Sequence, residues 1–148
     1  MKVQRLKRHA GQEGFSLAEL MVVIVIIGLL ATVVVPNVVQ KLFVAKKGAA
    51  KASLTTLYNA AEDYSLQHNG KWPDSLEQLV TPDENGQRYL RQTEVPMDPW
   101  GNPFLYEPPR AGESSPVIAT YGADGAPGGT GDDEDMDAQG VIDGKYND

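Results

Sequence analysis

The stretch GFSLAELMVVIVIIGLL, residues 14–30, decides the fold of this chain. From Leu20 to Val35 every residue is apolar or small and neutral. Together with the preceding residues 15–19, the run is about 21 residues long, and as a helix it matches the roughly 30 Å hydrocarbon core of a bilayer. No polar stripe interrupts the run, whereas a surface helix of a soluble domain would carry one. We therefore expect one membrane-spanning helix.

The apolar run has the features of a retained anchor rather than those of a removable secretory signal. It is longer than a typical signal core, and Pro36 and Asn37 follow it in place of a small-x-small cleavage site. Basic residues flank the run on both sides, Lys2, Arg5, Lys7 and Arg8 before it and Lys41, Lys46, Lys47 and Lys51 after it. Because the two groups are equal in size, the positive-inside rule does not choose an orientation.

The acidic residue Glu19 stands at the start of this apolar run. A carboxylate within a bilayer costs a few kcal/mol near the centre and less near the end of the segment. One reading is that Glu19 reaches back to the membrane surface. The other is that it meets a cation, and since no basic residue lies one helical turn away, that cation would come from another chain or from a new α-amino group.

The leader and the start of the apolar run resemble the type III signal sequence of type IV pilins and pseudopilins. The matching features are a short basic leader that ends in Gly14, then Phe15, Ser16, Leu17, Ala18 and Glu19, and an uninterrupted apolar helix. The resemblance implies that a prepilin peptidase cuts between Gly14 and Phe15 and methylates the new terminus on Phe15. It also makes Glu19 the acid that the family uses for assembly, and Pro36 the proline that interrupts family helices.

The chemistry of the new terminus agrees with this resemblance. Cleavage would create an α-amino group that is mostly cationic at neutral pH. In a stack of subunits, the carboxylate of Glu19 in one chain would pair with the ammonium of Phe15 in its neighbour, and this pair would fix the axial register. The resemblance also gives the orientation, with the leader (residues 1–14) in the cytoplasm and the globular part outside. The segment 15–36 is then the transmembrane and filament-core helix, which lies in membrane lipid before assembly.

Beyond Pro36 the apolar residues recur with helical spacing, so residues 37–69 are predicted to continue the helix with one apolar face. That face comprises Leu42, Ala45, Ala49, Ala52, Leu57, Ala60, Ala61 and Tyr64. Asn69-Gly70 supplies the left-handed residue that ends helices. Asp74 and Glu77 form a capping-box variant that predicts a short helix through about Val80. At Pro36 itself, the sequence permits either a simple kink or local melting when subunits pack.

The C-terminal half predicts a small sheet, and the whole chain an α+β fold. Phe104 to Tyr106 and the segment 116–122 read as strands, and the turn signals of Asp98-Pro99 and Gly101-Asn102 precede the first of them. We expect a long N-terminal membrane-anchored helix packed on a small antiparallel sheet, with a Gly/Asp-rich C-terminal loop. The globular domain spans residues 70–137, and residues 138–148 form an acidic tail for which the sequence leaves order and disorder open.

The stretch YGADGAPGGTGDDEDMD, residues 121–137, is the candidate metal site. Closely spaced aspartates among glycines supply hard oxygen ligands on a pliable backbone, which suits Ca²⁺, although the spacing is not that of an EF-hand. A solvated acidic loop is the alternative. DPWGNPFLYEPP (residues 98–109) followed by this loop resembles the major pseudopilins of type II secretion, which bind calcium there. The resemblance favours Asp124 and Asp135 as ligands, then Asp132, Asp133 and the carbonyl of Tyr121.

The remaining composition limits the function classes. The chain has 148 residues, a formal charge of −7 and no cysteine, so it has neither disulfides nor thiolate metal sites. Its acidic C-terminal end argues against nucleic acid as a partner. No catalytic motif is present, so we expect a structural protein and not an enzyme.

The resemblance therefore implies a filament subunit of the type II secretion pseudopilus that promotes export of folded proteins across the outer membrane. An adhesion, motility or DNA-uptake pilin is the alternative, although such pilins usually carry a C-terminal disulfide loop. The implied partners are other copies of the chain, prepilin peptidase, minor pseudopilins and the inner-membrane assembly platform. The implied location is the inner membrane, with the C-terminal domain in the periplasm.

Overall fold

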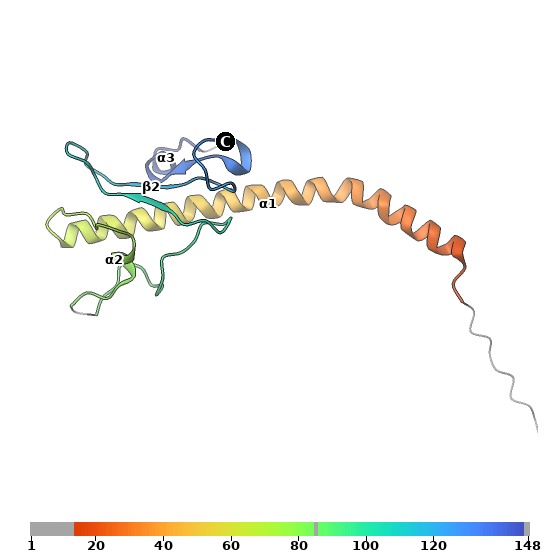
Figure 1. The fold of residues 1–148 in the computed structure, drawn as a ribbon, viewed down its shortest axis with the longest axis horizontal. Helices are drawn as coiled ribbons and strands as arrows, with labels where there is room; N and C mark the ends of the chain where they lie inside the picture. Colours follow the sequence, from red (N-terminus) through yellow and green to blue (C-terminus); the bar gives the residue numbers. More distant parts are fainter. Residues whose placement is uncertain (1–13, 85, 147–148) are drawn as a thin grey trace, which may run out of the picture. The chain divides into compact units, whose positions relative to one another are not determined.

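The computed structural model describes residues 14–84 and 86–146. Its elements, labelled in Figure 1 where there is room, are α1 (Leu17–Gln67), α2 (Glu77–Val80), β1 (Leu105–Glu107), β2 (Val117–Thr120), the 3₁₀ turn η1 (Gly131–Asp133), β3 (Met136–Asp137) and α3 (Ala138–Ile142). The α+β prediction is confirmed, since a long N-terminal apolar helix is combined with a small antiparallel sheet. The chain divides into two units, Met1–Gln40 and Lys41–Asp148, and α1 contributes residues to both.

The described part of the first unit is a helical segment without a core. Every residue from 14 to 40 is exposed, and most of these side chains are large and apolar. Within the described residues, α1 is the one helix long and apolar enough to cross a membrane. Exposure of such a surface to water is unfavourable, so this unit is built for contact with lipid or with other apolar helices.

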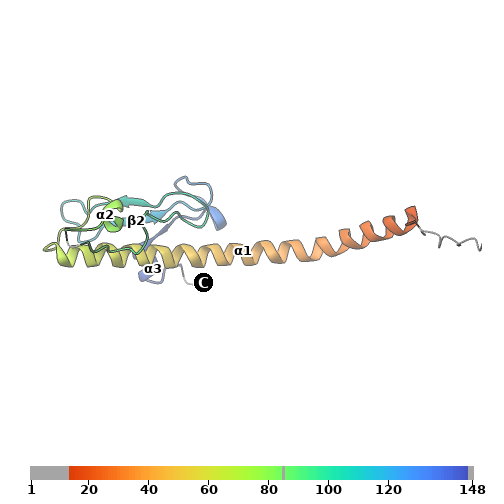
Figure 2. The ribbon, with the colours of Figure 1, turned by 90° about the horizontal axis from the view of Figure 1, so that it is seen from below.

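The second unit has its own core, between the second half of α1 and the sheet. The strand order is β1-β2-β3, and both pairs are antiparallel, with Leu105 opposite Ala119 and Thr120 opposite Met136. Figures 1 and 2 show the sheet and α2 beside this half of α1. Leu54, Leu57, Leu79, Ile118 and Met136 are among the largest fully buried side chains. Helix, short helix and sheet therefore share one hydrophobic cluster.

The predicted apolar face of residues 37–69 is right in its second half and wrong in its first. Residues 57, 60 and 61 are buried, but the expected members Leu42, Ala45, Ala49 and Ala52 are exposed. The buried face instead continues back through Leu54 and Ala50 to Lys47, which is half-buried. Alanine carries too little apolar area to set the phase of a helix, and Lys47 joins the buried face because Glu134 neutralises it.

The end of α1 and the start of α2 were both predicted from local sequence signals, and only the first prediction is right. The end of α1 is as predicted: Asn69 and Gly70 have φ of 55° and 83°, and the Gly70 N–H donates to the carbonyl of Ser65 at 2.9 Å. The predicted capping box of Asp74 and Glu77 is wrong. The residue that precedes α2 makes no side-chain cap, and the backbone N–H of Asp74 instead donates to Oε1 of Gln78 at 2.9 Å.

The acidic tail after residue 137, whose order the sequence left open, is ordered over the described residues 138–146. They form α3 and a turn, and Ala138 and Tyr146 are buried in the core, with Val141 packed against it. The apolar residues of this segment complete the core of a small domain.

Candidate functional site

Glu19 has a structural role at the start of α1 that the sequence analysis missed. Its Oε2 accepts a hydrogen bond from the backbone N–H of Ser16 at 2.8 Å, and Oγ of Ser16 accepts one from the N–H of Glu19 at 3.2 Å. This is a reciprocal capping box, and the Ser-x-x-Glu spacing in the sequence is its signal. Neither of the two readings of Glu19 drawn from the sequence included this contact.

The other residues of the predicted processing and assembly site lie on the same exposed unit. Gly14 is exposed, and the side chain of Phe15 is 83% exposed. The rest of the predicted leader, residues 1–13, lies outside the described residues. Pro36 lies within α1 and lacks a backbone donor, while the side-chain amide of its neighbour Asn37 donates to the carbonyl of Val33 at 2.8 Å. The helix therefore continues through the proline.

The candidate metal site is the aspartate loop, residues 121–137, which folds back on itself. The backbone N–H of Ala123 donates to the carbonyl of Asp132 at 2.9 Å, and so ties the beginning of the loop to η1. Gly122 has φ of 70°, and a Cβ placed there would lie 2.5 Å from the same carbonyl oxygen. This close approach of two backbone segments requires glycine.

The predicted ligands are spread along the loop and do not form one cluster. No group of three or more acidic or histidine side chains converges on a metal position within residues 14–84 and 86–146. Oδ1 of Asp124 accepts from the N–H of Ala126 at 3.1 Å, and Oδ1 of Asp132 accepts from the indole of Trp100 at 3.3 Å. Asp133 and Tyr121 are half-buried.

Asp135 is the member of this set whose environment fits a cation. Its Oδ2 accepts a hydrogen bond from the N–H of Gly128 at 2.8 Å, but its Oδ1 is buried and has no hydrogen-bond partner among the described residues. A buried carboxylate oxygen without a partner is costly. A hard cation, which prefers oxygen ligands, would satisfy this carboxylate oxygen. The donor chemistry therefore fits Ca²⁺ at Asp135.

A buried carboxylate outside the loop holds its N-terminal end, and the sequence analysis did not identify it as a site residue. Asp98 is 5% exposed. Its Oδ2 accepts from the hydroxyl of Thr120 at 2.6 Å, and its Oδ1 accepts from the N–H groups of Trp100 and Asn102 at 3.0 and 2.7 Å. The amide of Asn102 then donates to the carbonyl of Gly122 at 2.8 Å. Residues 98–102, which the sequence identifies as a turn, thus also hold the N-terminal end of the aspartate loop through hydrogen bonds.

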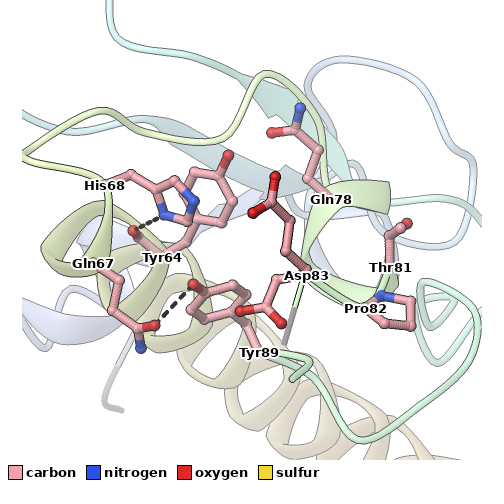
Figure 3. Close-up of a pocket in the computed structure, with 9 residues that line it drawn as sticks. Tyr64, Gln67, His68, Gln78, Thr81, Pro82, Asp83 and Tyr89 are labelled. Atoms are coloured by element: carbon pink, nitrogen blue, oxygen red, sulfur yellow. Dashed lines mark hydrogen bonds between the residues drawn. The ribbon is translucent and has the colours of Figure 1, made fainter. Parts of the chain in front are cut away.

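A concave region of about 480 Å³ lies at the C-terminal end of α1, away from the aspartate loop (Figure 3). The ring of His68 stacks on that of Tyr64 at 3.9 Å between centroids, and Nδ1 of His68 lies 2.8 Å from the Tyr64 carbonyl oxygen. Tyr89 packs edge-on against Tyr64 and donates to Oε1 of Gln67 at 3.0 Å. Burial, with the charge of Asp83, raises the pKa of Tyr89. These contacts give the aromatic side chains a packing role.

The chain was compared with known protein families. Residues 9–35 match the family described as the prokaryotic N-terminal methylation motif, and residues 37–139 match the family described as type II secretion system (T2SS), protein G. The first match includes Gly14, Phe15 and Glu19. The second includes the whole aspartate loop.

Curated relatives agree over most of the chain. The type II secretion system core protein G of Pseudomonas aeruginosa is 39% identical over 137 residues, which cover 84% of this chain and 93% of the relative. The proteins of the same name from Vibrio cholerae and Xanthomonas campestris are 38% and 35% identical, and cover 88% and 93% of this chain and 94% and 96% of the relatives. These matches confirm the resemblance drawn from the sequence and do not favour the type IV pilin alternative. The chain belongs to the type II secretion system protein G family, the major pseudopilins.

Proposed function

We propose that this chain acts as a non-enzymatic building block that polymerises through its exposed apolar helix into the pseudopilus. The observation that carries the proposal is a contrast between the two parts of α1. Residues 17–40 are mostly apolar and all exposed, whereas the second part of the helix packs into the hydrophobic core of the second unit. Such a surface is covered by lipid before assembly and by neighbouring helices afterwards. Growth of the filament then promotes the passage of folded proteins across the outer membrane.

The proposed assembly step begins with cleavage between Gly14 and Phe15 and methylation of Phe15. The ammonium group of the new terminus pairs with the carboxylate of Glu19 in the adjacent subunit. The capping box is compatible with this pair, because an ionised carboxylate has two oxygens and about four acceptor positions. Glu19 therefore serves two roles, as the cap of its own helix and as the acceptor of a neighbour's terminus.

The proposed partners follow from this step and from the family. Prepilin peptidase processes the chain, other copies extend the filament, and minor pseudopilins and the inner-membrane platform complete the assembly. The chain is anchored in the inner membrane with its C-terminal domain in the periplasm, and then joins the periplasmic filament. Nucleic acid has no part in this scheme, in keeping with the charge of −7.

We also propose that the aspartate loop binds one Ca²⁺ ion, with Asp135 as its principal side-chain ligand. The unpartnered Oδ1 of Asp135 supports this assignment. Asp124, Asp132, Asp133 and the carbonyl of Tyr121 remain ligand candidates in the same loop. A bound cation would satisfy the buried oxygen and fix the loop to the sheet, in a domain that has no disulfide to do so.

The experiment that tests the assembly role uses three substitutions at the capping box. Ser16→Ala removes the hydroxyl half of the capping box and keeps the carboxylate. Glu19→Gln keeps a side-chain oxygen that can accept from the N–H of Ser16 and removes the charge, and Glu19→Ala removes the charge together with that acceptor. We expect Ser16→Ala to form filaments, and both Glu19 variants to accumulate as processed monomers without filaments or secretion. Electron microscopy, a secretion assay and mass spectrometry of the mature terminus provide the measurements.

The comparison of the first two variants decides between the roles of Glu19. If Ser16→Ala fails and Glu19→Gln forms normal filaments, Glu19 acts through helix capping. Normal filaments from Glu19→Gln, or an uncut terminus in wild-type filaments, would contradict the pairing of Glu19 with the Phe15 ammonium.

A further inference from the structure

We propose that Tyr146 and Lys47 are positioning residues for the cation, because they fasten the two ends of the acidic segment 134–137 and so hold Asp135 in place. This inference rests on the proposed calcium site. Asp135 lies between Glu134 and Asp137, and each of these two is bound by a side chain from elsewhere in the second unit. Neither Lys47 nor Tyr146 is itself a proposed ligand.

The Tyr146 hydroxyl holds the C-terminal end of the acidic segment. It donates to Oδ2 of Asp137 at 2.6 Å and accepts from the backbone N–H of Asp137 at 3.2 Å. The other carboxylate oxygen of Asp137 accepts from the N–H of Gly140 at 2.7 Å and begins α3. A Cβ at Gly140 would lie 2.7 Å from the Tyr146 ring, so the two are in close contact. The backbone and the side chain of Asp137 are both fixed, two residues from Asp135.

Lys47 holds the N-terminal end of the same segment. Its Nζ lies 2.8 Å from Oε2 of Glu134, and 18% of the lysine side chain is exposed. One turn further along α1, Nζ of Lys51 donates to the backbone carbonyl of Tyr146. Both contacts therefore connect the acidic segment to α1, through Lys47 and through Lys51, which holds Tyr146. The helix thus fixes the position of the acidic segment.

The electrostatics of the Tyr146–Asp137 pair favour its persistence at neutral pH. Burial raises the pKa of Tyr146 to about 12, and the hydrogen bond to Asp137 adds to this shift. Burial acts to raise the pKa of Asp137 as well, but the hydrogen bonds from Tyr146 and Gly140 outweigh it and lower that pKa. A protonated phenol therefore faces an ionised carboxylate throughout the physiological range.

Fixed neighbours increase cation affinity because they reduce the ordering that binding would otherwise require. Loss of groups that orient ligands typically weakens metal binding about 10–100-fold. The proposed cation is also coupled to α1, because the contacts of Lys47 with Glu134 and of Lys51 with Tyr146 connect the helix to the segment that carries Asp135. By linkage, any change that moves residues 47–51 of α1 relative to the loop changes calcium affinity, and calcium changes the ease of that movement.

The experiment uses the processed full chain in detergent, with calcium affinity measured by calorimetry and melting temperature measured with calcium and with chelator. Tyr146→Phe removes the hydroxyl. Tyr106→Phe is the matched control, because the Tyr106 hydroxyl donates to the Pro73 carbonyl at 2.6 Å, away from the aspartate loop. We expect Tyr146→Phe to weaken calcium binding about tenfold and Tyr106→Phe to leave the affinity unchanged, although both lower the melting temperature in chelator.

A variant of Lys47 separates positioning from simple charge. Lys47→Gln removes a positive charge near the cation, so charge repulsion alone predicts tighter binding, whereas positioning predicts weaker binding. Lys47→Arg keeps the ion pair with Glu134 and should restore the affinity.

Each result has a distinct meaning. Equal calcium affinity in wild type and Tyr146→Phe, or tighter binding by Lys47→Gln, would overturn the positioning role and leave the calcium site intact. A wild-type chain that binds no calcium would overturn the site and this inference together, whereas the filament proposal would stand on the Glu19 variants.

Discussion

The two units of the chain differ in where their stability comes from. Residues 41–146 bury a cluster of leucine, isoleucine and aromatic side chains against one another. Residues 14–40 also carry many large apolar side chains, yet all of them are exposed. The second unit therefore has the contacts for a folded domain in water. The first, residues 14–40, buries none of its side chains and has the length and apolarity of a membrane-spanning segment.

Because of this difference, we expect the first part of α1 to affect mainly assembly and the second part to affect mainly the folding of the domain. Substitutions in the first unit are expected to alter the membrane and filament states with little effect on the folded domain. Substitutions in the second unit are expected to alter the domain first, and the filament through it. The predictions below test that separation, from the largest expected effect to the smallest.

The largest effect is expected from a pair of leucines in α1. Leu57 is 1% exposed and Leu29 is 65% exposed. Leu57→Ala should lower the free energy of unfolding of the second unit by about 2–5 kcal/mol, because it removes a core side chain and leaves a cavity. Leu29→Ala should leave that free energy unchanged. Chemical denaturation of the full chain in detergent, followed by tryptophan fluorescence, measures both, since Trp72 and Trp100 lie in the second unit.

A loss of domain stability in Leu29→Ala would contradict the separation of the two units. Filament formation by the same variant sharpens the test. Leu29→Ala is expected to weaken assembly because it removes apolar contact area between helices.

An intermediate effect is expected from calcium. Removal of calcium should lower the stability of the second unit by about 2.7 kcal/mol relative to a hundredfold excess over the dissociation constant. In hydrogen–deuterium exchange, calcium should slow the amides of residues 121–137 and leave those of residues 17–40 unchanged. Asp135→Asn should abolish the calcium effect, whereas Asp143→Asn, which alters an acid outside the aspartate loop, should keep it. Slower exchange in residues 17–40 would show that the units are coupled.

The smallest effect is expected at alkaline pH. Burial raises the pKa of Tyr106 and of Tyr146 to about 12, against about 10 in an unfolded chain. A pKa that is higher in the folded state contributes stability below pH 10, and this contribution is lost as the pH rises from 10 through 12. The second unit should therefore lose stability over this range. The double variant Tyr106→Phe/Tyr146→Phe should show a smaller slope, while the helix signal of residues 14–40, which contain no tyrosine, stays constant.

The sequence predicted the features that depend on long or specific patterns. The apolar run of residues 20–35 has one physical interpretation, and Asn69-Gly70 ends α1 where the backbone requires a left-handed residue. The strands near residues 105 and 118 were also predicted, because turn residues bound them. Each of these signals is local, so no tertiary contact was needed to interpret it.

The errors arose where tertiary contacts outweigh local preference. In the alanine-rich part of α1, the buried face includes Lys47, whose partner Glu134 lies 87 residues away in the sequence. The order of residues 138–146 is not visible in their acidic composition, because it depends on Tyr146, which reaches the core. The role of Asp98 also depends on Thr120, which lies far along the chain. The capping box of Ser16 and Glu19 is different, because its signal is local and was overlooked.

The position of that capping box has a consequence for the processed chain. If cleavage leaves Phe15 as the first residue, its ammonium stands immediately before Ser16, at the positive end of the helix dipole. A cation at this end is repelled by about 0.3–1 kcal/mol, and more strongly where the medium is apolar. In an isolated subunit, only its own Glu19 carboxylate opposes this repulsion. A neighbour's acid would add a second negative charge beside the ammonium, so cleavage by the peptidase would itself favour polymerisation.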